Sequence, residues 1–260
     1  MTLPHISSAS LLRAALPAAL ALTMSIQASA EGMADDVRLK ARMGYSIGGT
    51  APVDLPASIR KLNSYTLQPN ISIGLDATKP ITGRWGVTVG LRFENKGMHE
   101  DAQVKNYHEE IVRGGESLEG RFTGNVTTKV TMWMLTLPLQ ANWKASPRLG
   151  LRVGPYFSVL THGTFRGYAH DGYLRVGDPT GAKIELGSDP STRGDYDFSE
   201  HLRPLQWGVA LGADWDAGSR IGLYADINWG MSGIHKSSFK TIEQSLYPIY
   251  GTVGITYTIR

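Results

Sequence analysis

Apolar and polar residues alternate without a break along residues 37–49 of the chain. Apolar side chains stand at every odd position from Val37 to Ile47, and arginine, lysine, glycine or serine stands between them. Successive side chains of an extended strand point to opposite faces. The pattern therefore predicts a β-strand with one apolar face and one basic or small face. The apolar face could meet either a protein core or lipid.

The same alternation recurs in seven later segments. They cover residues 67–77, 84–94, 131–143, 149–159, 205–215, 220–230 and 249–260. The eight segments are about ten to thirteen residues long, whereas strands of soluble proteins most often have about five or six residues. A tilted strand that crosses a membrane needs about nine to eleven residues. The lengths therefore favour a membrane barrel.

The connections between these segments alternate between short and long. Short connections fall at residues 78–83, 144–148 and 216–219, and long ones at about 49–64, 97–128, 162–203 and 232–246. Outer-membrane barrels have short periplasmic turns and longer extracellular loops. The chain is therefore predicted to form an all-β, eight-stranded antiparallel up-and-down transmembrane β-barrel, with extracellular long loops and both termini in the periplasm.

Aromatic residues give a second indication of a membrane. All six tryptophans stand on the predicted apolar face, at or near the ends of strands. Tryptophan and tyrosine are enriched at both membrane interfaces. An aromatic girdle is therefore predicted at Tyr45, Trp85, Phe93, Trp133, Trp143, Trp207, Trp215, Trp229 and Tyr257, with the residues between the two belts facing lipid.

The opposite face of the segments carries charges among glycine and threonine. An arginine on the lipid face near the midplane costs about 2–4 kcal/mol, so these charges are expected in the lumen. Eight strands leave an interior that side chains can fill. A structural lumenal charge network is predicted from Arg38, Arg42, Asp76, Arg84, Arg92, Glu94, Arg152, Asp214, Arg220 and Asp226. The alternative for the same residues is a gated pore or a ligand pocket.

The N-terminus predicts export of the chain. Arg13 precedes or enters an apolar run at residues 14–24, and Ala28-Ser29-Ala30 forms a cleavage pattern before an acidic stretch. Residues 1–30 are therefore expected to be a cleaved signal peptide and residues 31–260 the barrel domain. The net charge of +3 is too small to indicate nucleic acid, and the chain has no cysteine for a disulfide or thiolate site.

Three prolines interrupt the strand pattern. Pro69, Pro138 and Pro155 lie within predicted strands, and proline cannot donate a ladder hydrogen bond. A closed barrel has no edge strand to place them on. Bulges or breaks are therefore expected at these positions.

Five segments together resemble, in this order, the PorT-like family of small outer-membrane β-barrels. They are "LRFENKG" (residues 91–97), "LTLPLQANW" (135–143), "LRVGPYFSVL" (151–160), "WGVALGADW" (207–215) and "LYADINWGMSGI" (223–234). The resemblance implies a barrel in the outer membrane and, for some members, an association with secretion and surface assembly. It also implies prolines at positions 138 and 155. The chain departs from the family by ending in Ile259-Arg260, and Tyr257 is the nearest candidate for the terminal aromatic residue.

The histidines of residues 31–260 all fall in or beside the predicted long loops. They are His99, His108, His162, His170, His201 and His235. A histidine beside an acidic residue can bind a metal ion or activate water. None of these histidines has the spacing of a known metal or hydrolase motif. A solvated polar loop is favoured, so no catalytic residue, metal or cofactor is expected.

The function expected from the sequence is non-enzymatic. It is a structural or interaction role of an outer-membrane protein, in secretion, surface assembly or adhesion, with membrane lipid and a protein at the extracellular loops as partners. One alternative is a small membrane-embedded enzyme or narrow pore at the barrel mouth. Another is a soluble ligand-binding barrel, which requires the apolar face to point inward.

Overall fold

The computed structural model describes residues 36–52, 57–239, 241–242 and 245–260. The predicted signal peptide, residues 1–30, lies outside them. The compact unit Arg38–Arg260 contains every element described below. In the order of the chain these are β1 (Arg38–Pro52), β2 (Ile59–Thr66), β3 (Ile71–Thr82), β4 (Trp85–Arg113), β5 (Glu116–Lys144), β6 (Leu149–Val176), β7 (Lys183–Leu186), β8 (Gly194–Asp197), the 3-10 helix η1 (Ser199–His201), β9 (Leu205–Asp216), β10 (Ile221–Gly230) and β11 (Leu246–Thr258).

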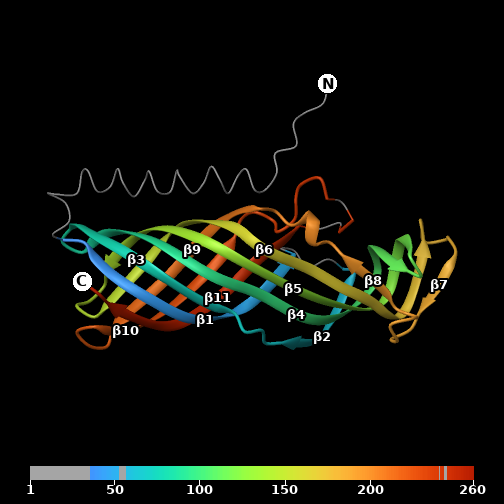
Figure 1. The fold of residues 1–260 in the computed structure, drawn as a ribbon, viewed down its shortest axis with the longest axis horizontal. Helices are drawn as coiled ribbons and strands as arrows, with labels where there is room; N and C mark the ends of the chain where they lie inside the picture. The colour runs from blue at the N-terminus through green and yellow to red at the C-terminus, as the bar shows by residue number, and fades with distance from the viewer. Residues whose placement is uncertain (1–35, 53–56, 240, 243–244) are drawn as a thin grey trace, which may run out of the picture. The chain divides into compact units, whose positions relative to one another are not determined.

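Eight of these strands close into an antiparallel barrel (Figure 1). The order of hydrogen-bonded neighbours is β3, β1, β11, β10, β9, β6, β5 and β4, and β4 pairs with β3 to complete the ring. The first and last strands are neighbours, with Arg42 opposite Thr256. The predicted eight-stranded barrel is confirmed. Within the described residues, no helix has the length and apolar character to cross a membrane.

The apolar face of the strands points outward. Along β10, Leu223 and Ile227 are about half exposed, while Tyr224 and Asp226 between them are buried. The same alternation runs through β9. Lipid is the solvent that makes such an exterior favourable. This orientation is the reverse of the one that the soluble ligand-binding barrel requires.

Three strands continue far beyond the predicted membrane-crossing segments. β4 and β5 have 29 residues each and β6 has 28. Residues 97–128 were expected to be a long loop, but they form a hairpin whose tip is at Gly114 and Gly115. The expected loop at 162–203 likewise contains the end of β6, β7, β8 and η1. The expected loop at 49–64 contains the end of β1 and the start of β2.

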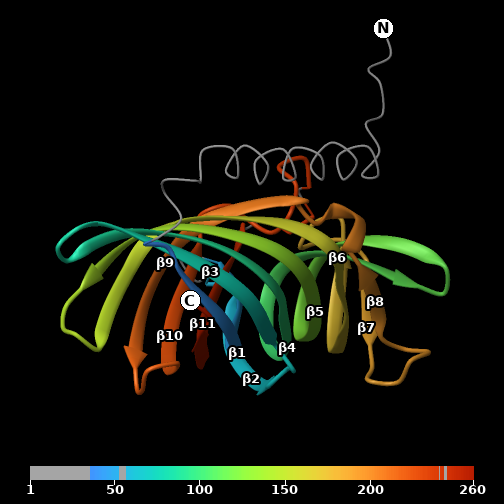
Figure 2. The same ribbon diagram turned by 60° about the vertical axis from the view of Figure 1, so that its left-hand side comes forward.

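The extended strands form a second closed β-structure, here called the hairpin end. β8 pairs with β6 and also with β4, through Val112 and Asp195, so β4, β5, β6 and β8 make a ring. Figure 1 shows β7 and β8 at the end of the barrel opposite the C-terminus, and Figure 2 shows the same strands after a turn. A hydrophobic core fills this region, with Ile111, Phe122 and Leu174 fully buried.

The polarity of the interior therefore reverses along single strands. On β4 the buried residues are first Thr88, Arg92 and Glu94, and then Met98 and Ile111. A bulge between Val104 and Tyr107 moves the inward positions from even to odd numbers. Asn106 lies in this bulge with φ 54°, a left-handed conformation that asparagine tolerates better than most residues.

Two of the three prolines produce gaps in the ladder without shifting its register. Pro69 lies outside the strands, between β2 and β3. Around Pro138 the pairing of β5 with β4 stops at Val89 and resumes at Arg92. Pro155 pairs with β9 in an uninterrupted ladder. On its other side, the pairing of β6 with β5 stops at Val153 and resumes at Tyr156. Breaks therefore occur as expected at Pro138 and Pro155, in each case in the pairing with one of the two neighbouring strands.

Candidate functional site: the charged lumen and the two ends of the barrel

Six of the predicted lumenal residues meet in one ion-pair cluster. It consists of Arg42, Arg92, Arg152, Asp76, Asp214 and Asp226. Each comes from a different strand, and none is more than 7% exposed. The three positive and three negative charges balance. A neutral set of paired side chains therefore fills the barrel at this level.

Arg152 and Arg42 each contact all three aspartates of this cluster, and Arg152 also contacts Gln140. Nε of Arg152 lies 2.5 Å from Asp214 Oδ2, its Nη2 lies 2.6 Å from Asp226 Oδ1, and its Nη1 donates to Gln140 Oε1 at 2.7 Å. Arg42 contacts both Asp76, at 2.6 Å, and Asp214. Arg92 reaches Asp226 at 3.0 Å. A buried charge is tolerated only when it is paired in this way.

Glycines opposite the charged residues make room for the cluster. Gly74 on β3 pairs with Arg42 on one side and Arg92 on the other. Gly212 on β9 pairs in the same way with Arg152 and Asp226. A Cβ at position 212 would clash with Asp226 Oδ1 and lie 2.7 Å from Arg152 Nη2. The glycine-rich inner face thus lets large guanidinium groups fill a narrow barrel.

The other four predicted residues do not join this cluster. Glu94 pairs instead with Lys96, at 2.8 Å, and both are buried. Arg38, Arg84 and Arg220 are exposed, and Arg220 Nη1 donates to Tyr257 Oη at 3.2 Å. The sequence analysis missed Lys96 and Gln140, although both stand at inward, even-numbered positions of strands.

Lys96 has an unusual environment for a buried amine. Its Nζ lies 5.1 Å from the centre of the Tyr156 ring and 5.9 Å from that of Tyr250, in addition to the Glu94 carboxylate. Aromatic faces attract a cation through their quadrupole. One carboxylate and two tyrosine rings therefore hold an ammonium group inside this barrel.

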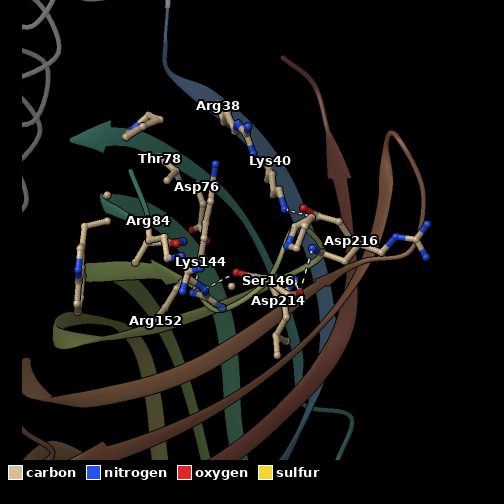
Figure 3. A pocket seen from close by; sticks show the side chains of 18 of the residues that line it. Arg38, Lys40, Asp76, Thr78, Arg84, Lys144, Ser146, Arg152, Asp214 and Asp216 are labelled. Carbon is tan, nitrogen blue, oxygen red and sulfur yellow. Dashed lines mark hydrogen bonds and ion pairs between the residues drawn. The ribbon is translucent and has the colours of Figure 1, made fainter. Parts of the chain in front are cut away.

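Basic residues surround the mouth at the end with the short turns. A cavity of about 60 Å³ opens there, and Figure 3 shows Arg38, Lys40, Arg84 and Lys144 around it. Lys40 pairs with Asp216 at 2.5 Å. The inner end of this cavity is formed by Asp76, Arg152 and Asp214. The mouth therefore ends at the ion-pair cluster.

The predicted girdle residues lie on the outer face near the two ends of the membrane-facing strands. Trp85 and Trp143 have ring centres 6.4 Å apart beside the short turns, and Phe93 and Trp133 stack at 5.1 Å toward the hairpin end. Trp207, Trp215, Trp229 and Tyr257 are 46–49% exposed. Tyr45 is half-buried, and its hydroxyl donates to the carbonyl of Gln68 at 2.5 Å.

An open groove of about 620 Å³ marks the outside of the hairpin end. Its lining includes His99, Lys129, Arg166, Tyr168 and Arg193. Arg166 pairs with Asp197 at 2.7 Å, and the guanidinium of Arg193 lies 4.2 Å from the centre of the Tyr168 ring. Arg193 also pairs with Asp195, at 2.8 Å, so the groove combines two ion pairs and Lys129 with an aromatic surface. Arginine and tyrosine are enriched at binding interfaces.

The histidines are dispersed, and one of them contacts several polar groups. Nε2 of His170 lies 2.8 Å from Asp101 and 3.1 Å from Thr127 Oγ1, and its Nδ1 lies 2.8 Å from Asp171. Thr127 donates its hydroxyl proton to Asp101 rather than to the imidazole. In the part of the chain that the structure describes, no three His, Asp or Glu side chains form a metal-binding group.

The closed barrel, the apolar exterior and the paired lumen define an outer-membrane β-barrel protein. The chain belongs to the family described as outer membrane protein beta-barrel domain, whose family model matches residues 27–236. It is accordingly a protein of the cell outer membrane. None of the curated protein sequences matches it.

Several solved structures align with most of this chain. CarO2 of Acinetobacter baumannii is 11% identical over 85% of this chain and 98% of its own, with a TM-score of 0.43. Ail of Yersinia pestis is 9% identical over 86% and 97%, with a TM-score of 0.34. The neisserial surface protein NspA is 9% identical over 86% and 98%, with a TM-score of 0.32.

Proposed function

We propose that this protein is a non-enzymatic interaction protein whose barrel is an anchor and whose hairpin end binds a partner outside the cell. The observation that carries the proposal is the contrast between the two parts. The lumen is filled by a balanced ion-pair cluster that is at most 7% exposed, whereas the hairpin end has its own core and an open groove. The proposal places the hairpin end outside the cell and the short turns in the periplasm, which is the usual orientation of outer-membrane barrels.

The filled lumen makes a direct prediction for conductance. Purified protein in a planar bilayer should show no steady unitary current, because Arg152 and its partners are at most 7% exposed and fill the barrel at their level. Steady unitary conductance would support the narrow-pore alternative and would contradict the anchor role.

The partner site is proposed to be the groove at Tyr168 and Lys129. A photo-crosslinking residue at position 168, introduced into the protein in its native membrane, should give a discrete protein adduct. The same residue at position 211, which faces outward between Trp207 and Trp215, should give lipid adducts only. Lys129→Glu should remove the adduct at 168, while Lys61→Glu, an exposed charge on β2, should leave it. Identical adducts with and without Lys129→Glu would contradict the proposed site.

Within the matched family, we propose that the chain is a PorT-like member. The support is the ordered set of motifs, including Gly154-Pro155-Tyr156 on β6. The signal peptide at residues 1–30 and the barrel domain at residues 31–260 belong to the same proposal. N-terminal sequencing of the protein from outer membranes should begin at Glu31.

A second candidate function is a membrane-embedded hydrolase that uses His170. The contact of this histidine with Thr127 and two aspartates is the observation that favours it. Nε2 of His170 already contacts both Asp101 and Thr127. This argues against the hydrolase, because a general base needs that nitrogen free for the nucleophile. Loss of lipid or peptide hydrolysis in His170→Ala, with a folded barrel, would establish the enzyme.

A further inference from the structure

We propose that the hairpin end contains a binding site for a small organic ammonium ion, formed by one buried and one half-buried carboxyl group and by aromatic rings. The site is a cavity of about 70 Å³ inside the hairpin end. Its lining includes Glu100, Glu109, Tyr107, Tyr196, Phe165 and Phe198. This inference goes beyond the proposed partner groove, because it concerns the inside of the ring and not its outer surface.

Glu109 is the residue that points to a ligand. It is 3% exposed, and its Oε2 has no hydrogen-bond partner. Glu100 brings a second carboxyl group to the same cavity. Among the described lining residues there is no lysine, arginine or histidine. Buried acids are normally paired, so the buried Glu109 carboxyl with an unpartnered oxygen, beside a second carboxyl at the same space, indicates a missing cation.

The titration behaviour of the two acids agrees with this interpretation. Burial raises the pKa of Glu109 to about 8 and that of Glu100 to about 7. Burial is the only cause of either shift, so no described positive charge offsets it. The other titratable groups that act on this region are four phenols and the Glu94 carboxylate; the phenols are Tyr65 on β2, Tyr107 on β4, Tyr196 on β8 and Tyr250 on β11.

The same barrel already holds an ammonium group by this chemistry. Lys96 lies between the Glu94 carboxylate and the rings of Tyr156 and Tyr250. Met98 is at the next even-numbered, inward position along β4, and it lines the cavity. The cavity therefore repeats the combination of carboxyl groups and aromatic rings, but without a lysine.

The lining favours an organic cation over a metal ion. Calcium takes six to eight oxygen ligands, whereas much of this wall is apolar, including Val104, Val126 and Phe165. Aromatic faces and a carboxylate suit an ammonium group attached to a short hydrocarbon. A volume of about 70 Å³ limits the ligand to a few heavy atoms.

The first experiment uses propylammonium as the probe and 1-propanol as its neutral equivalent of equal size. The refolded barrel in detergent micelles is titrated with each compound, and the ¹³C-labelled methyl group of Met98 is followed by NMR. We expect saturable shifts with propylammonium, with a dissociation constant on the order of 1 mM because so small a ligand offers few contacts. 1-Propanol should bind at least tenfold more weakly.

Glu109→Gln keeps the size of the side chain and removes its charge, so it should weaken propylammonium binding at least tenfold. Glu116→Gln makes the same chemical change at the exposed hairpin tip and should leave binding unchanged. Glu100→Gln provides a second test if Glu109→Gln disturbs the fold. Heat-dependent gel mobility and the Met98 spectrum without ligand report whether each variant is folded.

The pH profile separates a binding site from a merely structural pair of acids. An ammonium ion binds the ionised carboxyl group, so affinity should rise by up to about tenfold per pH unit between pH 6 and 8. Glu109→Gln should reduce this slope. The proposal is overturned if propylammonium causes no saturable shift, if 1-propanol binds equally well, or if Glu116→Gln weakens binding as much as Glu109→Gln.

Discussion

At the scale of single residues, the lumen shows how an eight-stranded barrel can be filled with charge. Each arginine of the cluster contacts at least two carboxylates, and each aspartate contacts at least two arginines. Removing one member leaves its partners buried and uncompensated. That loss costs more than the intact pairs contribute, because desolvation of the remaining charges is no longer offset.

Arg152→Met tests this argument. The variant keeps most of the volume of the side chain but leaves Asp214 and Asp226 short of a partner. We expect the free energy of unfolding to fall by about 3–5 kcal/mol, measured by guanidinium titration of the protein folded in lipid vesicles. Arg220→Met removes an exposed arginine from the end of the barrel and should change it by less than about 0.5 kcal/mol. Equal effects of the two variants would show that the cluster is not the source of stability.

The cluster contains six of the ten residues predicted for the lumen, and their grouping was not predicted. Alternation places Arg42, Arg92 and Glu94 on the inner face, yet it cannot show at which height each side chain points. Glu94 lies one inward position above Arg92 and pairs with Lys96 instead. Arg38 and Arg84 stand at strand ends, where the lumen opens to solvent. The height along the barrel depends on strand pairing, which no single segment encodes.

At the scale of elements, the membrane-crossing strands were predictable and their extensions were not. Residues 85–93 alternate because lipid and lumen impose opposite polarity on the two faces. Residues 99–103 read His-Glu-Asp-Ala-Gln, in which four of five residues are polar, as is typical of a loop. They remain extended because β5 pairs with them. Glu109 was missed because the bulge at residues 105–106 reverses which positions face inward.

The core of the hairpin end should be separable from the barrel by mutation. Phe122 is fully buried in it, and Phe→Ala in a core costs about 3–5 kcal/mol. Phe122→Ala should therefore open the hairpins to trypsin at sites such as Arg113 and Lys129, while the barrel keeps its heat-dependent gel mobility. Val112→Ala, which truncates a side chain that is 47% exposed, should leave the digestion pattern unchanged. Loss of the heat shift in Phe122→Ala would mean that the two parts fold as one unit.

Stability of the hairpin end should fall as the pH rises from about 5 to 8. Burial raises the pKa of Glu109 to about 8, so the folded form retains a proton that the unfolded form has already lost. Stability is then greatest below the ordinary glutamate pKa and declines by up to about 1.4 kcal/mol per pH unit for each such group.

Hydrogen exchange of the core amides, corrected for intrinsic rates, measures this dependence. Glu109→Gln should flatten it, leaving the smaller contribution of Glu100, whose pKa is raised to about 7. Glu116→Gln should keep the dependence of the unaltered protein. A stability that rises with pH in this range would contradict the assignment of Glu109 as a buried, unpaired acid.

At the scale of the whole molecule, one chain uses two opposite solvation schemes. The membrane-facing part has an apolar exterior and a paired, polar interior. The hairpin end has an apolar core and a polar exterior, as expected for a β-structure in water. The transition lies near Lys96 and Met98, where the inward positions change from charged to apolar. The same strands therefore serve as membrane anchor and as scaffold of the projecting part.

Exposure alone cannot show where lipid ends and water begins, but charge substitution can. Leu211 lies on β9 midway between Trp207 and Trp215 and is 54% exposed, and Leu62 on β2 is 52% exposed. An arginine near the bilayer midplane costs about 2–4 kcal/mol, whereas one in water costs little. Leu211→Arg should therefore lower the free energy of unfolding in lipid vesicles by roughly that amount, and Leu62→Arg should leave it almost unchanged. If Leu62→Arg is as costly as Leu211→Arg, lipid reaches β2 and the boundary lies beyond the aromatic belt at Trp133; if neither is costly, the apolar exterior does not face lipid.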